Sequence, residues 1–127
     1  MNNYPIGDFL IQIKNAALAH RKSVECETSK LKHATADVLK KKKILDAVTE
    51  KDGKLTVTLS YHKKEPMLLD LKLVSTPGLR QYMSVDDLGS RKRRRSTFLI
   101  LSTPKGVMSS DDAIKQKTGG EVLVEIW

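Results

Sequence analysis

A strand pattern in the first half of the chain sets the strictest limit on how it folds. From Leu55 to Tyr61, apolar or aromatic residues alternate with Thr or Ser, which is the two-residue period of a half-buried β-strand. The dipeptide Asp52-Gly53 just before this run is typical of a tight hairpin turn. After a turn at 62–66, the segment 67–73 repeats the alternation and is predicted to be the partner strand. The sequence therefore predicts an antiparallel sheet with one buried face.

Two stretches before this sheet have the 3.6-residue period of amphipathic helices. One follows Asp8 and places Phe9 and Ile13 on a single face. The other is capped by Thr28 or Ser29, and the lysines at 40–43 load its last turn with positive charge, which suits the helix dipole. A short strand at 23–27 lies between them. The first half is therefore predicted to run helix, strand, helix and then an antiparallel meander.

The segment Thr76-Pro77-Gly78 interrupts these patterns and predicts a boundary, because Pro and Gly both favour turns. We expect an N-terminal α+β subdomain at 1–75 and a β-rich C-terminal subdomain at 76–127. Beyond the boundary we expect strands at 79–85, 97–102 and 122–126, a turn at 86–90, and one short helix that starts at Ser109 or Ser110 and stops at Gly119-Gly120. The predicted fold class is α+β, with two interlocked subdomains, the second mostly β with one short helix.

The charge of the chain favours a polyanionic partner. Its 127 residues include 23 Lys plus Arg against 15 Asp plus Glu, which gives a net charge of +8 and a pI near 9.6. Both halves are positive, so the charge is not a detachable tail. Nucleic acid is the leading candidate, and a solvated basic surface without a specific partner is the alternative at this stage.

Side chains that could support catalysis or hold a metal are scarce. His20, His33 and His62 are too far apart in sequence to form a local metal pair, and one cysteine cannot complete a zinc site. Asp111-Asp112 is explained by the start of a helix. We therefore expect no enzymatic activity, no metal and no cofactor.

The cysteine content and the distribution of apolar residues bear on the cellular compartment of the protein. Cys26 lies between two glutamates that disfavour a thiolate, and a single cysteine is consistent with a reducing compartment. No apolar run approaches the roughly 18 residues of a membrane span, and the N-terminus lacks a signal-peptide pattern. We expect a protein of the cytosol, or of an organellar stroma or matrix, with no membrane partner.

Two segments of the second half have the chemistry of an RNA contact. A basic run occupies Arg91, Lys92, Arg93, Arg94 and Arg95. Five adjacent cations cannot all pair internally, so this run predicts contact with phosphates. The lysines at 40–43 are equally well explained by a helix end and by such contact.

The second segment is the turn that follows Leu101. Ser102 and Thr103 supply hydroxyls, Lys105 a cation, and Gly106 close backbone approach, which together suit the minor groove of RNA with its 2′-hydroxyls. On residue chemistry alone, a loop that only caps the next helix explains this turn equally well.

The chain closely resembles the bacterial-type ribosomal protein S8 family of the small subunit, almost from end to end. The similar segments are Asp8 to Ala16 (D-x-L-x-x-I-[RK]-N-A), Ser29 to Lys32 (S-K-L-K), Val38 to Lys40 (V-L-K), Pro77 to Tyr82 (P-G-x-R-x-Y), Ser102 to Ser109 (S-T-S-K-G-[VI]-M-[TS]) and Gly119 to Trp127 (G-G-E-[VI]-L-x-x-x-W). A chance match does not account for motifs that occur in this order over almost the whole chain.

The resemblance implies a non-enzymatic structural protein of the small ribosomal subunit, located in the cytoplasm within the ribosome. It would bind the central domain of small-subunit ribosomal RNA (rRNA), mainly through its C-terminal subdomain, and support assembly. Neighbouring proteins such as ribosomal protein S5 would be further partners, without homo-oligomers. Some relatives also bind their own messenger RNA and repress its translation. The alternatives are a basic DNA-binding or nucleoid-type module and a small nuclease, which lacks an acid-base pair here.

The resemblance implies an rRNA site in two parts. The C-terminal part comprises Arg80, Tyr82, Ser102, Thr103, Lys105, Gly106, Gly119, Gly120 and Glu121, to which the basic run is added. The N-terminal part, expected to be less specific, comprises Lys14, Asn15, Ser29, Lys30 and Lys32.

Two segments depart from the family pattern. Pro104 replaces the second serine of S-T-S-K-G, which removes a hydroxyl and an amide donor and stiffens the turn. The basic run, between Ser90 and Ser96, replaces a glycine-rich apolar segment.

Overall fold

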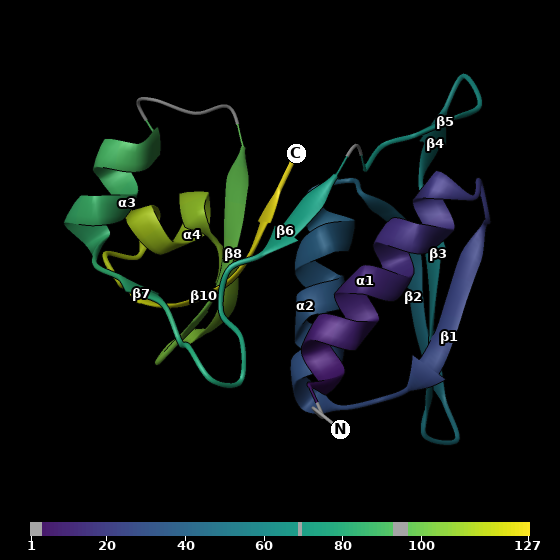
Figure 1. Cartoon of the computed structure of the whole chain (residues 1–127), viewed down its shortest axis with the longest axis horizontal. Helices are drawn as coiled ribbons and strands as arrows, with labels where there is room; N and C mark the ends of the chain where they lie inside the picture. Colours follow the sequence, from purple (N-terminus) through teal and green to yellow (C-terminus); the bar gives the residue numbers. More distant parts are fainter. Residues whose placement is uncertain (1–3, 69, 93–96) are drawn as a thin grey trace. The chain divides into compact units, whose positions relative to one another are not determined.

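Residues 4–68, 70–92 and 97–127 are described by a computed structural model, which divides the chain into two units, Asn3–Leu69 and Asp70–Trp127. Each unit has its own sheet and its own helices (Figure 1). The segment Thr76-Pro77-Gly78, where the sequence suggested a boundary, forms a turn after the first strand of the second unit, because Thr76 and Leu79 exchange two backbone hydrogen bonds of 3.0 and 3.1 Å.

The N-terminal unit packs two helices on one face of an antiparallel sheet (Figure 1). Its elements are α1 (Pro5–Leu18), β1 (Ser23–Glu27), α2 (Lys30–Lys41), β2 (Leu45–Lys51), β3 (Lys54–Leu59) and the two-residue strands β4 (Tyr61–His62) and β5 (Glu65–Pro66). The strand order β1-β3-β2 places β3 in the centre. Phe9, Ile13, Leu39, Leu55 and Val57 are almost fully buried.

Local signals explain how these elements begin and turn. Helix α1 starts at Pro5, earlier than predicted, because proline is well suited to the first helical position. Ser29 caps α2, since its Oγ accepts a hydrogen bond from the Lys32 amide at 3.2 Å. Asp52-Gly53 joins β2 to β3 with both φ angles positive, at 52° and 77°. The predicted cap and hairpin are confirmed.

The C-terminal unit packs two short helices against a five-stranded antiparallel sheet (Figure 1). Its elements are β6 (Leu71–Leu73), β7 (Tyr82–Met83), α3 (Val85–Lys92), β8 (Phe98–Thr103), β9 (Gly106–Ser109), α4 (Ser110–Lys115) and β10 (Gly120–Ile126). The strand order is β6-β10-β8-β9, and β7 also pairs with β10. A buried cluster from strands and helices forms its core: Leu88, Leu99, Leu101, Met108, Ala113 and Val122.

One predicted strand pairing is wrong. Strand β3 pairs with β1 and β2, whereas β6, which lies in the predicted partner segment, pairs with β10. Alternation predicts which side chains share a face of a sheet, but it does not select the neighbouring strand. Leu69, also in that segment, lies outside the described residues.

A helix replaces the turn predicted at 86–90. Helix α3 starts after Ser84, whose Oγ accepts from the Asp87 amide at 3.2 Å, while an Asp87 carboxylate oxygen accepts from the Ser84 amide at 3.3 Å. Leu88 is 1% exposed and anchors the helix in the core. Gly89 lowers the intrinsic helix propensity of this segment, so the sequence pattern pointed to a turn. The α+β class is confirmed, with two helices in the C-terminal unit.

Candidate nucleic-acid interface

The turn between β8 and β9 is held by the hydroxyl of Thr103. This hydroxyl donates to the Gly106 carbonyl at 2.7 Å and accepts from the Lys105 amide at 3.1 Å. Gly106 has a φ of 120°, a conformation that favours glycine, while Pro104 and Lys105 form the exposed tip. The Ser102 hydroxyl makes no hydrogen bond with the described part of the chain. Thr103 therefore shapes the turn, whereas the Ser102 hydroxyl is not used to hold it.

Lys105 is oriented by the end of helix α4. Its Nζ donates to the carbonyl oxygen of Gln116, the C-cap residue of this helix, at 3.0 Å. A cation at a helix C-terminus is favourable, and the ammonium group keeps two further protons for an anion. Nothing in the sequence pattern predicted that Gln116 would contribute to the site.

A cross-strand row places three predicted residues side by side. Glu121 of β10 lies opposite Tyr82 of β7 on one side and opposite Ser102 of β8 on the other. Directly opposite residues project from the same face of a sheet, so these side chains are neighbours. Tyr82 is 70% exposed. Arg80 extends the row, because its Nη1 lies 3.1 Å from Oε2 of Glu121.

Gly119 and Gly120 let three strands approach one another. A Cβ added to Gly120 would lie 2.3 Å from the Ser102 carbonyl oxygen, and one added to Gly119 would lie 2.4 Å from the Met83 carbonyl oxygen. The prediction that these glycines stop helix α4 is wrong. The helix ends at Lys115, and Lys117 takes the positive φ of 55° that follows it.

These contacts bring nine predicted residues together in one region of the C-terminal unit, around the β8–β9 turn and the start of β10. We call it the hairpin surface: Arg80, Tyr82, Ser102, Thr103, Lys105, Gly106, Gly119, Gly120 and Glu121. It combines hydroxyls, an exposed aromatic ring, two cations and a carboxylate.

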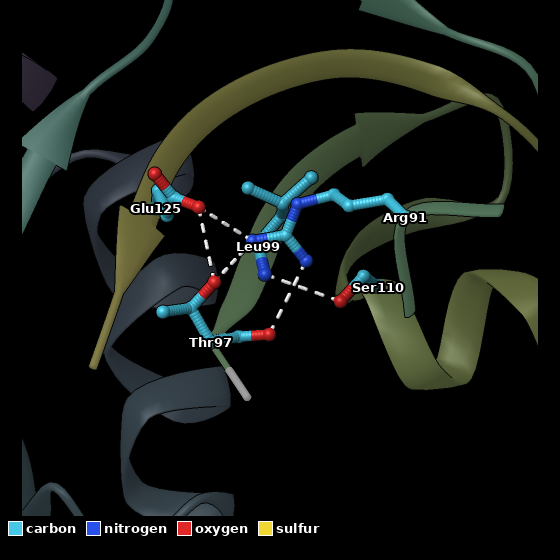
Figure 2. Close-up of polar contacts among 5 residues, drawn as sticks. All are labelled: Arg91, Thr97, Leu99, Ser110 and Glu125. Atoms are coloured by element: carbon cyan, nitrogen blue, oxygen red, sulfur yellow. Dashed lines mark hydrogen bonds and ion pairs between the residues drawn. The ribbon is translucent and has the colours of Figure 1, made fainter. Parts of the chain in front are cut away.

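Arg91, the first residue of the basic run, points inward (Figure 2). Its Nη2 lies 2.6 Å from Oε2 of Glu125, and the two side chains are only 12% and 13% exposed. The guanidinium also donates to the hydroxyl and, at 3.2 Å, to the carbonyl of Thr97. Since its charge is already paired, we leave Arg91 out of the interface. Lys92 ends α3, and Arg93, Arg94 and Arg95 lie outside the described residues.

The residues predicted in the N-terminal unit form two groups. Lys14 and Asn15 lie on α1, and Asn15 lines a cavity of about 510 Å³ beside β1. Ser29, Lys30 and Lys32 lie at the start of α2. Ser29 acts as the helix cap, and Lys32 Nζ donates to the Glu27 carbonyl at 3.0 Å. The exposed Lys30 side chain makes no hydrogen bond with the described residues.

The surroundings of Cys26 disfavour the ionised form of its thiol. Burial raises the pKa of the Cys26 thiol, Glu25 and Glu27 raise it further, and Lys32 and Lys54 oppose them. The thiol is therefore poorly nucleophilic at neutral pH.

Neither a metal site nor a membrane span is found in the described ranges. Within residues 4–68, 70–92 and 97–127, no three His, Cys, Asp or Glu side chains gather closely enough to hold a metal ion. No described helix combines the length and the apolar character needed to cross a membrane.

Comparison with known proteins gives consistent matches over almost the whole chain. The family described as Ribosomal protein S8 matches residues 4–127. The small ribosomal subunit protein uS8 of Nitratidesulfovibrio vulgaris strain DP4 is 39% identical over 123 residues, which cover 97% of each chain. Its counterpart in Roseiflexus castenholzii is 40% identical over 130 aligned residues and 98% of each chain. The counterpart in Anaeromyxobacter sp. strain K is 41% identical over 128 residues, 97% of this chain and 96% of the relative.

Proposed function

Because the chain belongs to the ribosomal protein S8 family, we propose that it binds the central domain of small-subunit rRNA through the hairpin surface and supports assembly of that domain. As a member of the family it is a structural component of the small ribosomal subunit, not an enzyme, and it is located in the cytoplasm within the ribosome. The observation that carries the proposal is the row of Tyr82, Glu121 and Ser102 beside the Thr103 turn.

The chemistry of this row suits RNA better than a generic polyanion. Arg80 and Lys105 can approach phosphates, and the exposed ring of Tyr82 can pack on a base or a ribose. Glu121 is only an acceptor, so it would repel a phosphate but accept from a 2′-hydroxyl or a base amino group. Ser102 can both donate and accept. A surface that mixes cations with an acceptor at its centre therefore favours a groove that presents hydroxyls, as the RNA minor groove does.

The remaining predicted contacts have narrower parts in the proposal. Pro104 supplies neither an amide donor nor a hydroxyl, so this turn would make fewer hydrogen bonds to RNA than the family pattern implies. Asn15 and Lys30 would touch RNA from the N-terminal unit with little specificity. Contact with ribosomal protein S5, a monomeric state and repression through the protein's own messenger stay predictions. A messenger RNA that folds into a structure similar to the rRNA element would bind to the same surface.

Binding of Ser102→Ala to a central-domain transcript tests the proposal. Its hydroxyl makes no hydrogen bond within residues 4–68, 70–92 and 97–127, so the loss should fall on the complex, by about 0.5–1.5 kcal/mol, with unchanged thermal stability. Ser90→Ala is the matched control, since Ser90 is an exposed serine of the same unit outside the hairpin surface. Equal affinities for the two variants would remove Ser102 from the interface.

Competition separates the proposal from the DNA-binding alternative. The transcript should outcompete duplex DNA of equal length, and its affinity should fall steeply with salt as phosphate counterions are displaced. Equal competition by the duplex would favour a nucleoid-type function, and a flat salt response would contradict the phosphate contacts.

A further inference from the structure

Strand β7 carries Tyr82, which belongs to the proposed rRNA interface. The strand is too short for its own backbone pairing to fix its position. It is two residues long, and its ladder with β10 is formed with Gly120 and Glu121. Two-residue strands have few ladder hydrogen bonds, so their position depends on contacts at their ends. The residues before β7 make such a contact.

The hydroxyl of Ser75 ties the residue before β7 to strand β10. Ser75 is 0% exposed, and its Oγ donates to the Val122 carbonyl at 2.6 Å and accepts from the Gln81 amide at 2.9 Å. The Val122 amide also donates to the Gln81 carbonyl, at 2.8 Å. Both polar groups of the Gln81 backbone are therefore bonded to β10, one directly and one through Ser75.

The neighbours of Gln81 in sequence are the two ligand-facing residues of this segment. Arg80 precedes it and reaches Glu121, whereas Tyr82 follows it and lies opposite Glu121. Between Ser75 and Gln81, the Thr76–Leu79 turn closes the loop on itself. The orientation of both side chains thus depends on where the Gln81 backbone is held.

We infer that Ser75 is a positioning residue of the RNA interface, which acts through the Gln81 backbone on Arg80 and Tyr82. This inference rests on the proposed rRNA binding by the hairpin surface. Loss of the hydroxyl would leave the Gln81 amide and the Val122 carbonyl short of a buried partner. The loop would then sample more conformations, and binding would have to restrict them again.

A sequence signal for Ser75 exists. The alternation that buries Leu71 continues through Leu73 to position 75, where a polar side chain replaces the expected apolar one. A serine at a core-facing position needs internal hydrogen bonds, because a buried hydroxyl without partners is costly.

The first test compares Ser75→Ala with Ser110→Ala. Ser110 is 6% exposed, and its Oγ accepts from the Leu99 amide at 3.1 Å, so each variant loses a buried hydroxyl bonded to backbone in the same unit. Affinity for the central-domain transcript is measured at a temperature where circular dichroism shows both variants folded. Ser75→Ala should weaken binding about tenfold, equivalent to about 1.4 kcal/mol, and Ser110→Ala by less than about twofold. Equal losses would overturn the inference.

A double-mutant cycle of Ser75→Ala and Tyr82→Ala measures whether the two side chains are coupled in RNA binding. A residue that only stabilises the fold would show no such coupling. If Ser75 acts through Tyr82 and its neighbour, the effect of Ser75→Ala should shrink to less than about threefold in the Tyr82→Ala background. Purely additive effects would assign Ser75 to stability alone. Should Ser75→Ala fail to fold, Ser75→Cys keeps a weak donor of similar size and carries the same cycle.

The cycle also distinguishes this inference from the proposed function. Unchanged binding by Tyr82→Ala would reject the hairpin surface itself. Weakened binding by Tyr82→Ala, together with equal effects of the Ser75 and Ser110 substitutions, would leave the interface in place and reject only the role of Ser75.

Discussion

Replacing Arg91 by methionine should destabilise the fold without affecting RNA binding by the folded protein. Its guanidinium pairs with the Glu125 carboxylate, which is 13% exposed and would keep the hydrogen bond from the Thr97 hydroxyl at 3.0 Å. Removing one member of a buried ion pair costs about 3–5 kcal/mol, and the remaining hydrogen bond places the expected loss near the lower end, at about 3 kcal/mol. This is a large part of the 5–15 kcal/mol that is typical for a whole domain.

The pair formed by Arg80 and Glu121 provides an internal contrast. Arg80 is 45% exposed, so Arg80→Met should lower the free energy of unfolding by less than about 1 kcal/mol. Because Arg80 belongs to the hairpin surface, the same change should weaken binding of the central-domain transcript. Urea unfolding followed by circular dichroism, and RNA titration of the folded variants, measure the two effects separately.

A second variant separates a buried charge from lost packing. In Arg91→Met combined with Glu125→Met, no uncompensated carboxylate remains, so most of the lost stability should return. A loss below about 1 kcal/mol in Arg91→Met, or a double variant no more stable than the single one, would refute the reasoning about this buried pair.

Three further changes test other parts of the fold. Gly120→Ala should lower the free energy of unfolding by about 1–3 kcal/mol, because the added Cβ would collide with the Ser102 carbonyl. Gly89 lies in a helix with open space around it, so Gly89→Ala should raise the free energy of unfolding by up to about 1 kcal/mol. Equal effects of the two variants in thermal melts would contradict this account. Ser29→Ala should cost about 1 kcal/mol through loss of the α2 cap, and urea unfolding that matches the unchanged protein would argue against that cap. Alkylation of Cys26 by iodoacetamide should be slow at pH 7, because the pKa of its thiol is raised. The alkylation rate should increase at a higher pH than for a free cysteine, whose pKa is about 8.5. A rate equal to that of free cysteine would show that burial does not protect the thiol.

Signals confined to a few residues predicted local structure well. The cap at Ser29 and the Asp52-Gly53 hairpin depend on atoms within three residues of one another, so the sequence carries them directly. The hydroxyls and cation of the Ser102 turn were likewise visible as chemistry. What residue types alone left undecided was whether that chemistry served the helix or RNA.

Features that depend on distant partners were not predictable in this way. Arg91 and Glu125 are 34 residues apart, and only the placement of α3 against β10 turns this arginine inward while its charge suggested a surface. Alternation in β6 likewise revealed a buried face but not the neighbour that covers its edge. Sequence distance thus accounts for the missed ion pair and the missed strand pairing, whereas helix α3 and the end of α4 were missed although their signals are local.

The close approach at Gly120 has a consequence for how this site can change over evolutionary time. The backbone beneath the turn leaves no room for a side chain at Gly120, whereas the tip formed by Pro104 and Lys105 is exposed. Substitutions should therefore be excluded at the base and tolerated at the tip, and the proline that departs from the family pattern lies at the tolerant end. The tip can therefore vary while the backbone at its base is fixed. Replacing the tip residues by those of a relative should alter the RNA preference of the protein without changing the structure of the sheet.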